Sequence, residues 1–281
     1  MRGHTMRILP LVPSMAGILL FFVVPLFDVL RRSFLNDGGT TFVGAANYQA
    51  AIANGVFREA TAHTLLFLAV GLPLLLGLSL LAALLLEKAT PLRSLAKSAL
   101  LVPLAVPSFA VVLVVALLFD PVELADDAAR TVGMSSSSRL DGPAAFVVLE
   151  GLYIWKNLGF AVLLWLTALS RVPLSCREAA VLDGAGRVRS TVFVVLPLIA
   201  PMATFITVLS VASAFRMYRE AYLLFGAYPP ADIYLIPHLF ANWFADVSIG
   251  KLAAATVLLI VPFVLIASAT TVLARRNGRR R

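Results

Sequence analysis

The sequence predicts an all-α polytopic membrane protein with six transmembrane helices joined by short polar segments. Of its 281 residues 60% are hydrophobic and only 14% are charged, whereas soluble domains carry about 25% charged residues. Long apolar runs separate the charges, and a soluble chain of this length has no core large enough to bury such runs. The runs do not alternate apolar and polar residues, so they predict membrane helices rather than barrel strands.

Six apolar segments are long enough to cross a bilayer, which takes about 20 helical residues. They are 8–30, 64–86, 99–119, 144–170, 191–214 and 252–274. The first follows Arg2 and Arg7, as in a signal peptide, but it is longer than a signal core and ends without a small-x-small cleavage site. We therefore interpret it as an uncleaved span and expect a single transmembrane domain over 1–281.

The distribution of positive charge predicts the orientation. An even number of spans places both termini on one side, and that side holds fourteen Lys and Arg residues against eight on the other. Cytoplasmic segments carry the excess of Lys and Arg, so both termini should be cytoplasmic, although Arg31 and Arg32 lie on the poorer side. The net charge of +8 then reflects orientation and contact with anionic membrane lipid, with no nucleic acid as partner.

Several classes of protein lack support in the sequence. The single cysteine, Cys176, makes neither an internal disulfide nor a cysteine metal site. The histidines at 4, 63 and 238 show no ligand spacing, so no metal site is expected. The chain has no Gly-x-x-x-x-Gly-Lys-Ser/Thr phosphate loop and cannot itself hydrolyse ATP. We find no clustered acids for an enzyme, and no internal repeat of the kind many secondary transporters have.

The segment 173–189, between the fourth and fifth spans, predicts more than a connector. Pro173 suits the first turn of a helix, good helix formers follow from Ser175, and Gly184 and Gly186 then interrupt them. This pattern predicts a helix of about three turns, a glycine bend and a second helical stretch. Small residues would let another surface approach the backbone closely, and the flanking charges would stay in water. Composition alone leaves two interpretations open, a docking element or an ordinary loop.

A motif in this segment resembles a known family. The run Glu178-Ala179-Ala180-x-x-Asp183-Gly184-Ala185, followed by Leu196-Pro197, is similar to the loop motif of binding-protein-dependent ABC importer permeases. Further resemblance, to the carbohydrate-uptake branch and to the maltose-type first permease subunit, lies in Phe42-Val43-Gly44-x-x-Asn47-Tyr48, Leu101-Val102-Pro103-x-x-Val106-Pro107 and Glu220 to Gly226. The chain departs from the family at Val188 and Thr191, where aromatic residues are common.

The resemblance implies a permease subunit of an ATP-driven importer in a prokaryotic inner membrane, translocating a sugar delivered by an extracytoplasmic solute-binding protein. Its partners would be a second, distinct permease and two ATPase subunits. This chain would bind no cofactor, and the partner ATPase would use ATP and Mg²⁺. The alternatives are a stand-alone secondary transporter or channel, and an ABC permease for a non-sugar solute.

The resemblance also implies the site residues. ATPase docking through a coupling helix would involve Arg177, Glu178, Ala179, Ala180, Asp183, Gly184 and Ala185. The substrate pathway would involve Trp155, Asn157, Gly159, Ser213 and Met217. For the aromatic and charged residues of the fourth span an interfacial belt, with Lys156 extended to the membrane surface, is the alternative. The region 215–222 is expected at the outer mouth, either facing the binding protein or as a solvated patch.

Overall fold

The computed structural model describes residues 12–87, 90–119, 142–261 and 264. The start of the first predicted span, the loop 120–141, most of the second half of the sixth span and the arginine-rich tail lie outside the described residues. The described part is helical apart from turns and one isolated β-bridge, between Leu35 and Phe42. The prediction of an all-α polytopic membrane protein is confirmed.

Four helical stretches are long and apolar enough to cross a membrane, and a bent helix pair and a shorter apolar helix accompany them. The four are Val12–Arg32, Gly55–Leu86, Pro143–Leu169 and Arg187–Phe225; the bent pair is Arg93–Ala105 with Ser108–Leu118, and the shorter helix is Ile249–Val261. Each predicted span thus overlaps a helix. The second and fifth helices extend well past the predicted 64–86 and 191–214, because helical structure continues beyond the apolar core of each segment.

The third predicted span, 99–119, is not a single straight helix. The axis bends by 90° between Ala105 and Ser108, where Val106 takes an extended conformation (ψ 123°). The cause is Pro107, since a residue before proline is displaced from the helical region and proline cannot donate the next backbone hydrogen bond.

Chain contacts divide the structure into two units. Unit 1 contains the described residues among 1–59 and 239–266, and unit 2 those among 60–238. Unit 1 holds α2 (Val12–Ile18), η2 (Leu19–Val23), α3 (Val24–Arg32), α4 (Ala46–Ala53), the start of α5 (Gly55–Leu86), the end of α15 (Ile236–Ala245) and the helix Ile249–Val261.

Hydrogen bonds fold the polar segment that follows the first span in unit 1. Asn47 donates from Nδ2 to the carbonyls of Ser33 (3.0 Å) and Leu35 (2.7 Å), and the Ser33 and Tyr48 hydroxyls lie 2.7 Å apart. The Gly250 amide donates to Asp37 Oδ1 (2.9 Å). Asn47 and Tyr48 of the outer-loop motif therefore have a structural role, because they hydrogen-bond to the hydroxyl and carbonyl groups that follow the end of α3.

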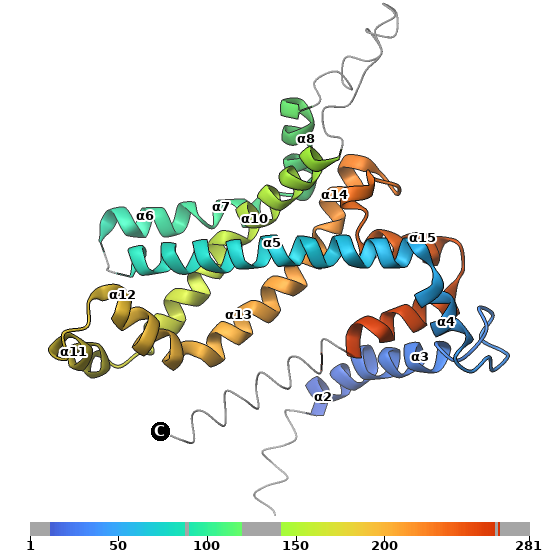
Figure 1. The fold of residues 1–281 in the computed structure, drawn as a ribbon, viewed down its shortest axis with the longest axis horizontal. Helices are drawn as coiled ribbons and strands as arrows, with labels where there is room; N and C mark the ends of the chain where they lie inside the picture. Colours follow the sequence, from blue (N-terminus) through green and yellow to red (C-terminus); the bar gives the residue numbers. More distant parts are fainter. Residues whose placement is uncertain (1–11, 88–89, 120–141, 262–263, 265–281) are drawn as a thin grey trace, which may run out of the picture. The chain divides into compact units, whose positions relative to one another are not determined.

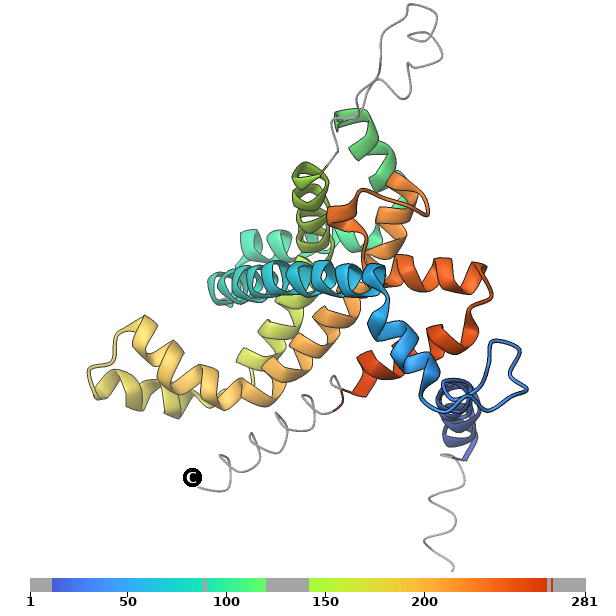
Figure 2. The same ribbon diagram turned by 45° about the vertical axis from the view of Figure 1, so that its right-hand side comes forward.

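Unit 2 contains the remaining helices. They are the rest of α5, α6 (Pro91–Ala99), α7 (Val102–Ala105), α8 (Ser108–Phe119), α10 (Pro143–Leu169), α11 (Leu174–Leu182), α12 (Arg187–Ser190), η4 (Thr191–Val195), α13 (Leu196–Arg216), α14 (Tyr218–Phe225), η5 (Ala231–Ile233) and the start of α15. Within this unit α11 and α12 lie beyond one end of α10 and α13, whereas α8 and α14 lie toward the other end of α10 (Figures 1 and 2).

The core of unit 2 lies where α5, α10 and α13 pack together. Apolar residues of all three helices fill it, including Leu75, Leu149 and Ile206. Two of its polar contacts are hydrogen bonds between helices: Trp165 donates to Ser79 Oγ (3.0 Å), and Tyr153 donates to the Ser210 carbonyl (2.9 Å). Pairing matters here because an unsatisfied polar group away from water costs several kcal/mol.

Candidate functional site

The segment 173–189 forms the helix–bend–helix that its sequence predicts. Helix α11 begins after Pro173 and ends at Leu182, and α12 begins at Arg187. Gly184 takes a left-handed conformation (φ +76°), and the Ala185 amide donates to the Ala180 carbonyl (2.9 Å). This arrangement ends a helix cleanly, because glycine occupies the left-handed region without a Cβ penalty.

Contacts with the ends of two long helices hold α11 in place. Arg177 forms an ion pair with Glu87, just beyond α5 (2.7 Å), and donates to the Leu169 carbonyl at the end of α10 (3.3 Å). Arg187 donates to the Leu84 carbonyl (3.4 Å). Arg177 therefore faces α5 and α10 and links α11 to the ends of both helices. Its predicted contact with an ATPase stays a prediction.

The other predicted docking residues differ in exposure. Glu178, Ala179, Asp183 and Gly184 are exposed and Ala185 is half-buried, whereas Ala180 is buried. Ala180 therefore packs α11 against the rest of unit 2. The accessible small and charged residues extend from the middle of α11 to the bend.

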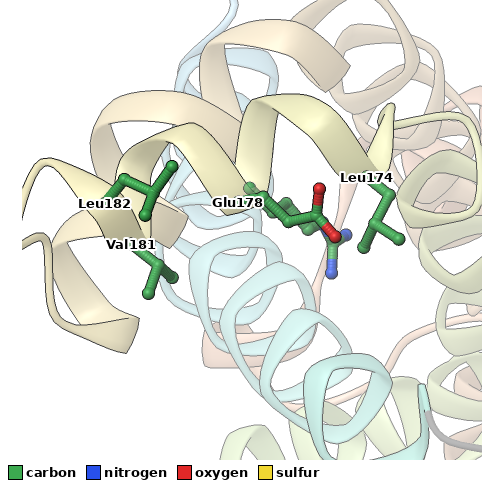
Figure 3. Close-up of a pocket in the computed structure, with 5 residues that line it drawn as sticks. Leu174, Glu178, Val181 and Leu182 are labelled. Atoms are coloured by element: carbon green, nitrogen blue, oxygen red, sulfur yellow. The ribbon is translucent and has the colours of Figure 1, made fainter.

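Sequence reasoning missed an apolar face on α11. Leu174, Val181 and Leu182 are 68%, 66% and 88% exposed. With Arg177 and Glu178 they line an open hollow of about 530 Å³, and Figure 3 shows the labelled side chains projecting from α11. The spacing 174, 178, 181 and 182 places them on one side of a helix, so the periodicity of the segment could have revealed this face. We name Leu174, Glu178, Val181 and Leu182 the α11 face.

A second hollow, the polar cavity, lies toward the end of α13 that is far from α11, beside the middle of α10. It has a volume of about 170 Å³. Its lining comes from α7, α8, α10, α13, α14 and the residue between the last two: Leu104, Ser108, Lys156, Asn157, Ser213, Arg216, Met217, Arg219 and Glu220. The short connection at Met217 brings the end of α13 and the start of α14 to the same cavity.

A buried ion pair crosses the polar cavity. Lys156 Nζ lies 2.5 Å from Glu220 Oε1, and their side chains are 15% and 5% exposed. The Ser108 hydroxyl also donates to Glu220 Oε1 (2.7 Å), and Lys156 donates to Ser108 Oγ (3.2 Å). Lys156 thus pairs within the protein instead of extending to the membrane surface. Its partner is Glu220, 64 positions later, and not the nearby Glu150.

The predicted pathway residues divide into two groups. Asn157, Ser213 and Met217 line the polar cavity. Trp155 is 45% exposed and outside the lining. Gly159 is packed so closely against α6 that a Cβ there would overlap the Leu100 carbonyl oxygen. Close packing therefore explains why position 159 is a glycine. The pathway roles of all five predicted residues stay predictions.

Comparison with known proteins assigns the chain to a family. Residues 76–279 match the family described as binding-protein-dependent transport system inner membrane component. The chain belongs to this family. It is a multi-pass permease component, and ATP hydrolysis is the task of a separate subunit in such systems.

Relatives match the permease over nearly its full length. The sn-glycerol-3-phosphate transport system permease protein UgpA of Yersinia pseudotuberculosis is 31% identical, over 89% of this chain and 87% of its own. The arabinooligosaccharides transport system permease protein AraP of Bacillus subtilis is 28% identical (90% and 83%). The trehalose/maltose transport system permease protein MalF of Thermococcus litoralis is also 28% identical (94% and 90%).

The fold also matches a solved transporter. A chain from the crystal structure of a bacterial ABC transporter involved in the import of the acidic polysaccharide alginate superposes with a TM-score of 0.70 at 19% sequence identity. The match covers 95% of this permease and 93% of that chain. At this level of identity the match establishes a shared fold and nothing finer.

Proposed function

We propose that this permease forms half of the translocation pathway of an ATP-driven sugar importer. The observation that carries the proposal is the α11 face, an exposed apolar surface beside the family motif. Its three apolar side chains are 66–88% exposed and lie on a helix outside the long apolar stretches. Burial of one such side chain contributes about 1.5–3 kcal/mol, so a protein partner would bind this face with useful energy.

An ATPase subunit is the partner that this face fits. The α11 face would enter a groove on one ATPase, with the exposed Glu178 as its polar contact. ATP and Mg²⁺ would bind to the ATPases, and this chain would bind no cofactor. Closing of the ATPase dimer would move α11, and the contacts of Arg177 with Glu87 and Leu169 would pass that movement to α5 and α10. Such a rigid-body movement is a known way to switch a pathway between two states.

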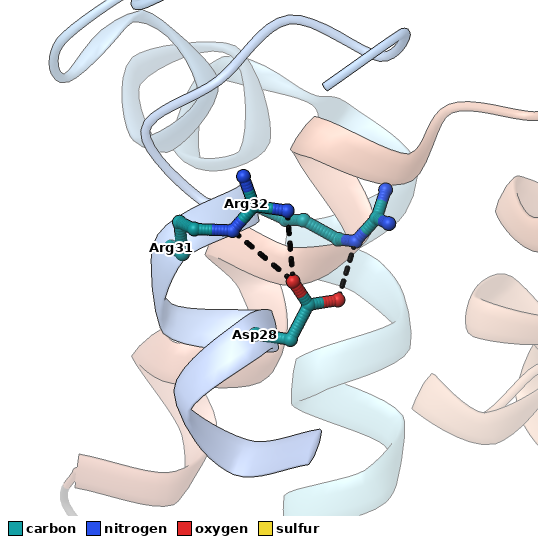
Figure 4. Close-up of polar contacts among 3 residues, drawn as sticks. All are labelled: Asp28, Arg31 and Arg32. Atoms are coloured by element: carbon teal, nitrogen blue, oxygen red, sulfur yellow. Dashed lines mark hydrogen bonds and ion pairs between the residues drawn. The ribbon is translucent and has the colours of Figure 1, made fainter. Parts of the chain in front are cut away.

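In the proposed orientation the α11 face lies in the cytoplasm, with both termini on the same side. The strongest evidence against this orientation comes from Arg31 and Arg32, because the orientation places them on the side opposite the cytoplasm. Both guanidinium groups bind Asp28, at 2.9 and 2.6 Å (Figure 4). The count of fourteen Lys and Arg residues against eight still favours a cytoplasmic α11 face.

The polar cavity is the proposed point of contact with substrate. Its volume of about 170 Å³ is below the roughly 300–1,000 Å³ of a complete small-molecule site, so a second, distinct permease would supply the remainder. An extracytoplasmic solute-binding protein would deliver the sugar. Carbohydrate is favoured as the substrate class because AraP, UgpA and MalF bear the names of arabinooligosaccharide, glycerol phosphate and trehalose/maltose systems.

Copurification of the ATPase tests this proposal. The permease is coexpressed with a candidate partner permease and ATPase and purified in detergent, alongside Glu178→Lys and Gly184→Pro. Proline cannot take the φ of +76° found at Gly184, and Glu178 is exposed, so both changes should disturb docking and leave the spans intact. We expect the ATPase to remain with the wild type and to be lost from both variants. A well-folded permease that never retains an ATPase would favour a stand-alone transporter.

A further inference from the structure

We infer that the substrate which contacts the polar cavity is an anionic carbohydrate, one that carries a carboxylate, phosphate or sulfonate group. This inference rests on the proposed function and adds the chemical class of its substrate. It comes from the charges that line the cavity. Three basic residues, Lys156, Arg216 and Arg219, face a single acidic residue, Glu220.

The acidic residue is already neutralised. Glu220 Oε1 accepts from both Lys156 Nζ (2.5 Å) and the Ser108 hydroxyl (2.7 Å). These two contacts hold the carboxylate of Glu220 in a fixed place. One negative and one positive charge therefore cancel within the cavity, and the cavity does not repel an anion through Glu220.

Two positive charges are left over. Arg216 donates from Nη2 to Ser213 Oγ (2.6 Å), a neutral partner. Within the described ranges of the chain, neither Arg216 nor Arg219 forms an ion pair with a carboxylate. Both side chains belong to exposed residues that line the cavity, so their guanidinium groups are accessible to a ligand. A neutral sugar would make no use of this excess charge, whereas an anionic group would bind to it.

The chemistry of these groups suits an acidic sugar. Guanidinium groups bind carboxylate and phosphate with two parallel charge-assisted hydrogen bonds. The lining also carries neutral polar groups for sugar hydroxyls. Asn157 donates from Nδ2 to the Tyr153 carbonyl (2.8 Å), which leaves its Oδ1 to accept from a hydroxyl group. The same cavity could thus hold the charged group on Arg216 and Arg219 and a sugar hydroxyl on Asn157.

Probes that differ only in charge test the inference. The intact importer, with its partner permease and ATPase, is purified in detergent and titrated calorimetrically. One pair of probes is methyl β-D-glucuronide and methyl β-D-glucoside, and a second pair is glucose 6-phosphate and glucose. The first pair reports on a carboxylate and the second on a phosphate. We expect the anionic member of at least one pair to bind at least about tenfold more tightly, which corresponds to ~1.4 kcal/mol.

Variants tie the preference to the cavity. Arg216→Gln and Arg219→Gln should each abolish most of the preference, Arg216→Lys and Arg219→Lys should retain part of it, and added salt should weaken it. Arg58→Gln is the matched control, because Arg58 is an exposed arginine of α5 outside the cavity lining. Melting temperatures of all variants check that the fold is intact.

The outcomes separate this inference from the proposed function. If neutral and anionic probes bind equally, or if the preference survives both glutamine variants, the inference is wrong while ATPase copurification still supports an importer. If no ATPase copurifies and no carbohydrate of either kind binds, the proposed function fails and the inference fails with it.

Discussion

The α11 face and the polar cavity lie toward opposite ends of α13 and are built in opposite ways. The α11 face comes from nine consecutive residues and exposes its apolar side chains, up to 88% for Leu182. The polar cavity comes from several helices and gathers charged side chains, from the exposed Arg216 and Arg219 to Glu220 at 5% exposure. An exposed apolar face invites a protein partner, whereas a cavity lined by charged groups suits a small polar ligand. The comparison predicts that mutations in the two regions will have separable effects.

The largest effect is expected from breaking the ion pair of the polar cavity. Glu220→Ala leaves the Lys156 ammonium enclosed without its partner, and removal of one partner of a buried ion pair costs about 3–5 kcal/mol. We expect a clear fall in melting temperature in detergent.

The double variant Lys156→Met with Glu220→Leu is the control for that prediction. It removes both charges and should restore much of the lost stability. If the single and double variants have the same melting temperature, the ion pair observed at 2.5 Å does not stabilise the folded permease.

On the α11 face the effect should appear in binding and not in folding. Leu182→Asp removes an exposed apolar side chain and adds a charge, so the permease should melt as the wild type does. Loss of about 2 kcal/mol of burial energy predicts an ATPase affinity roughly 30-fold weaker, measurable by titration of the ATPase against the immobilised permease.

The control for Leu182 is Tyr228→Asp. Tyr228 is 75% exposed and belongs to the segment that follows α14, and α14 lies away from α11 within unit 2 (Figure 1). Equal loss of ATPase binding in both variants would contradict the assignment of docking to the α11 face.

Two glycines of the same helix, α10, sharpen the contrast between packed and open positions. A Cβ at Gly159 would overlap the Leu100 carbonyl, whereas a Cβ at Gly151 would meet nothing within 4 Å. Gly159→Ala should therefore destabilise the permease by about 1–3 kcal/mol through overpacking. Gly151→Ala should be neutral or slightly stabilising, since alanine favours helix. Thermal melts of the two variants give the comparison, and a harmless Gly159→Ala would show that the helices separate easily there.

The smallest effect on stability is expected for the Arg177–Glu87 ion pair that links the α11 face to α5. Its side chains are 26% and 30% exposed, and pairs near the surface contribute about 0–1 kcal/mol. Glu87→Gln should scarcely change the melting temperature but should raise the ATP hydrolysed per substrate transported. An unchanged ratio in proteoliposomes would show that the contact does not transmit movement.

The sequence by itself determined the features that depend on local order. Apolar length and missing alternation predicted the membrane helices. The run from Glu178 to Ala185 predicted the family, which the match over residues 76–279 confirmed, and the position of α11. Pro173 and Gly184 marked where α11 begins and ends, since the backbone preferences of proline and glycine act within a few residues. The apolar spacing of Leu174, Val181 and Leu182 was also present in the sequence, although only the structure revealed its exposure.

Tertiary structure alone decided which distant groups meet. Lys156 and Glu220 are 64 positions apart and Arg177 and Glu87 are 90 apart, and no local pattern specifies either pair. The 90° bend at Pro107 was likewise undecided, because a proline in a membrane helix can be accommodated with little bending when neighbours satisfy the freed backbone groups. Local preferences act along the chain, but an ion pair depends on how helices pack, and packing is set by side chains from every part of the chain at once.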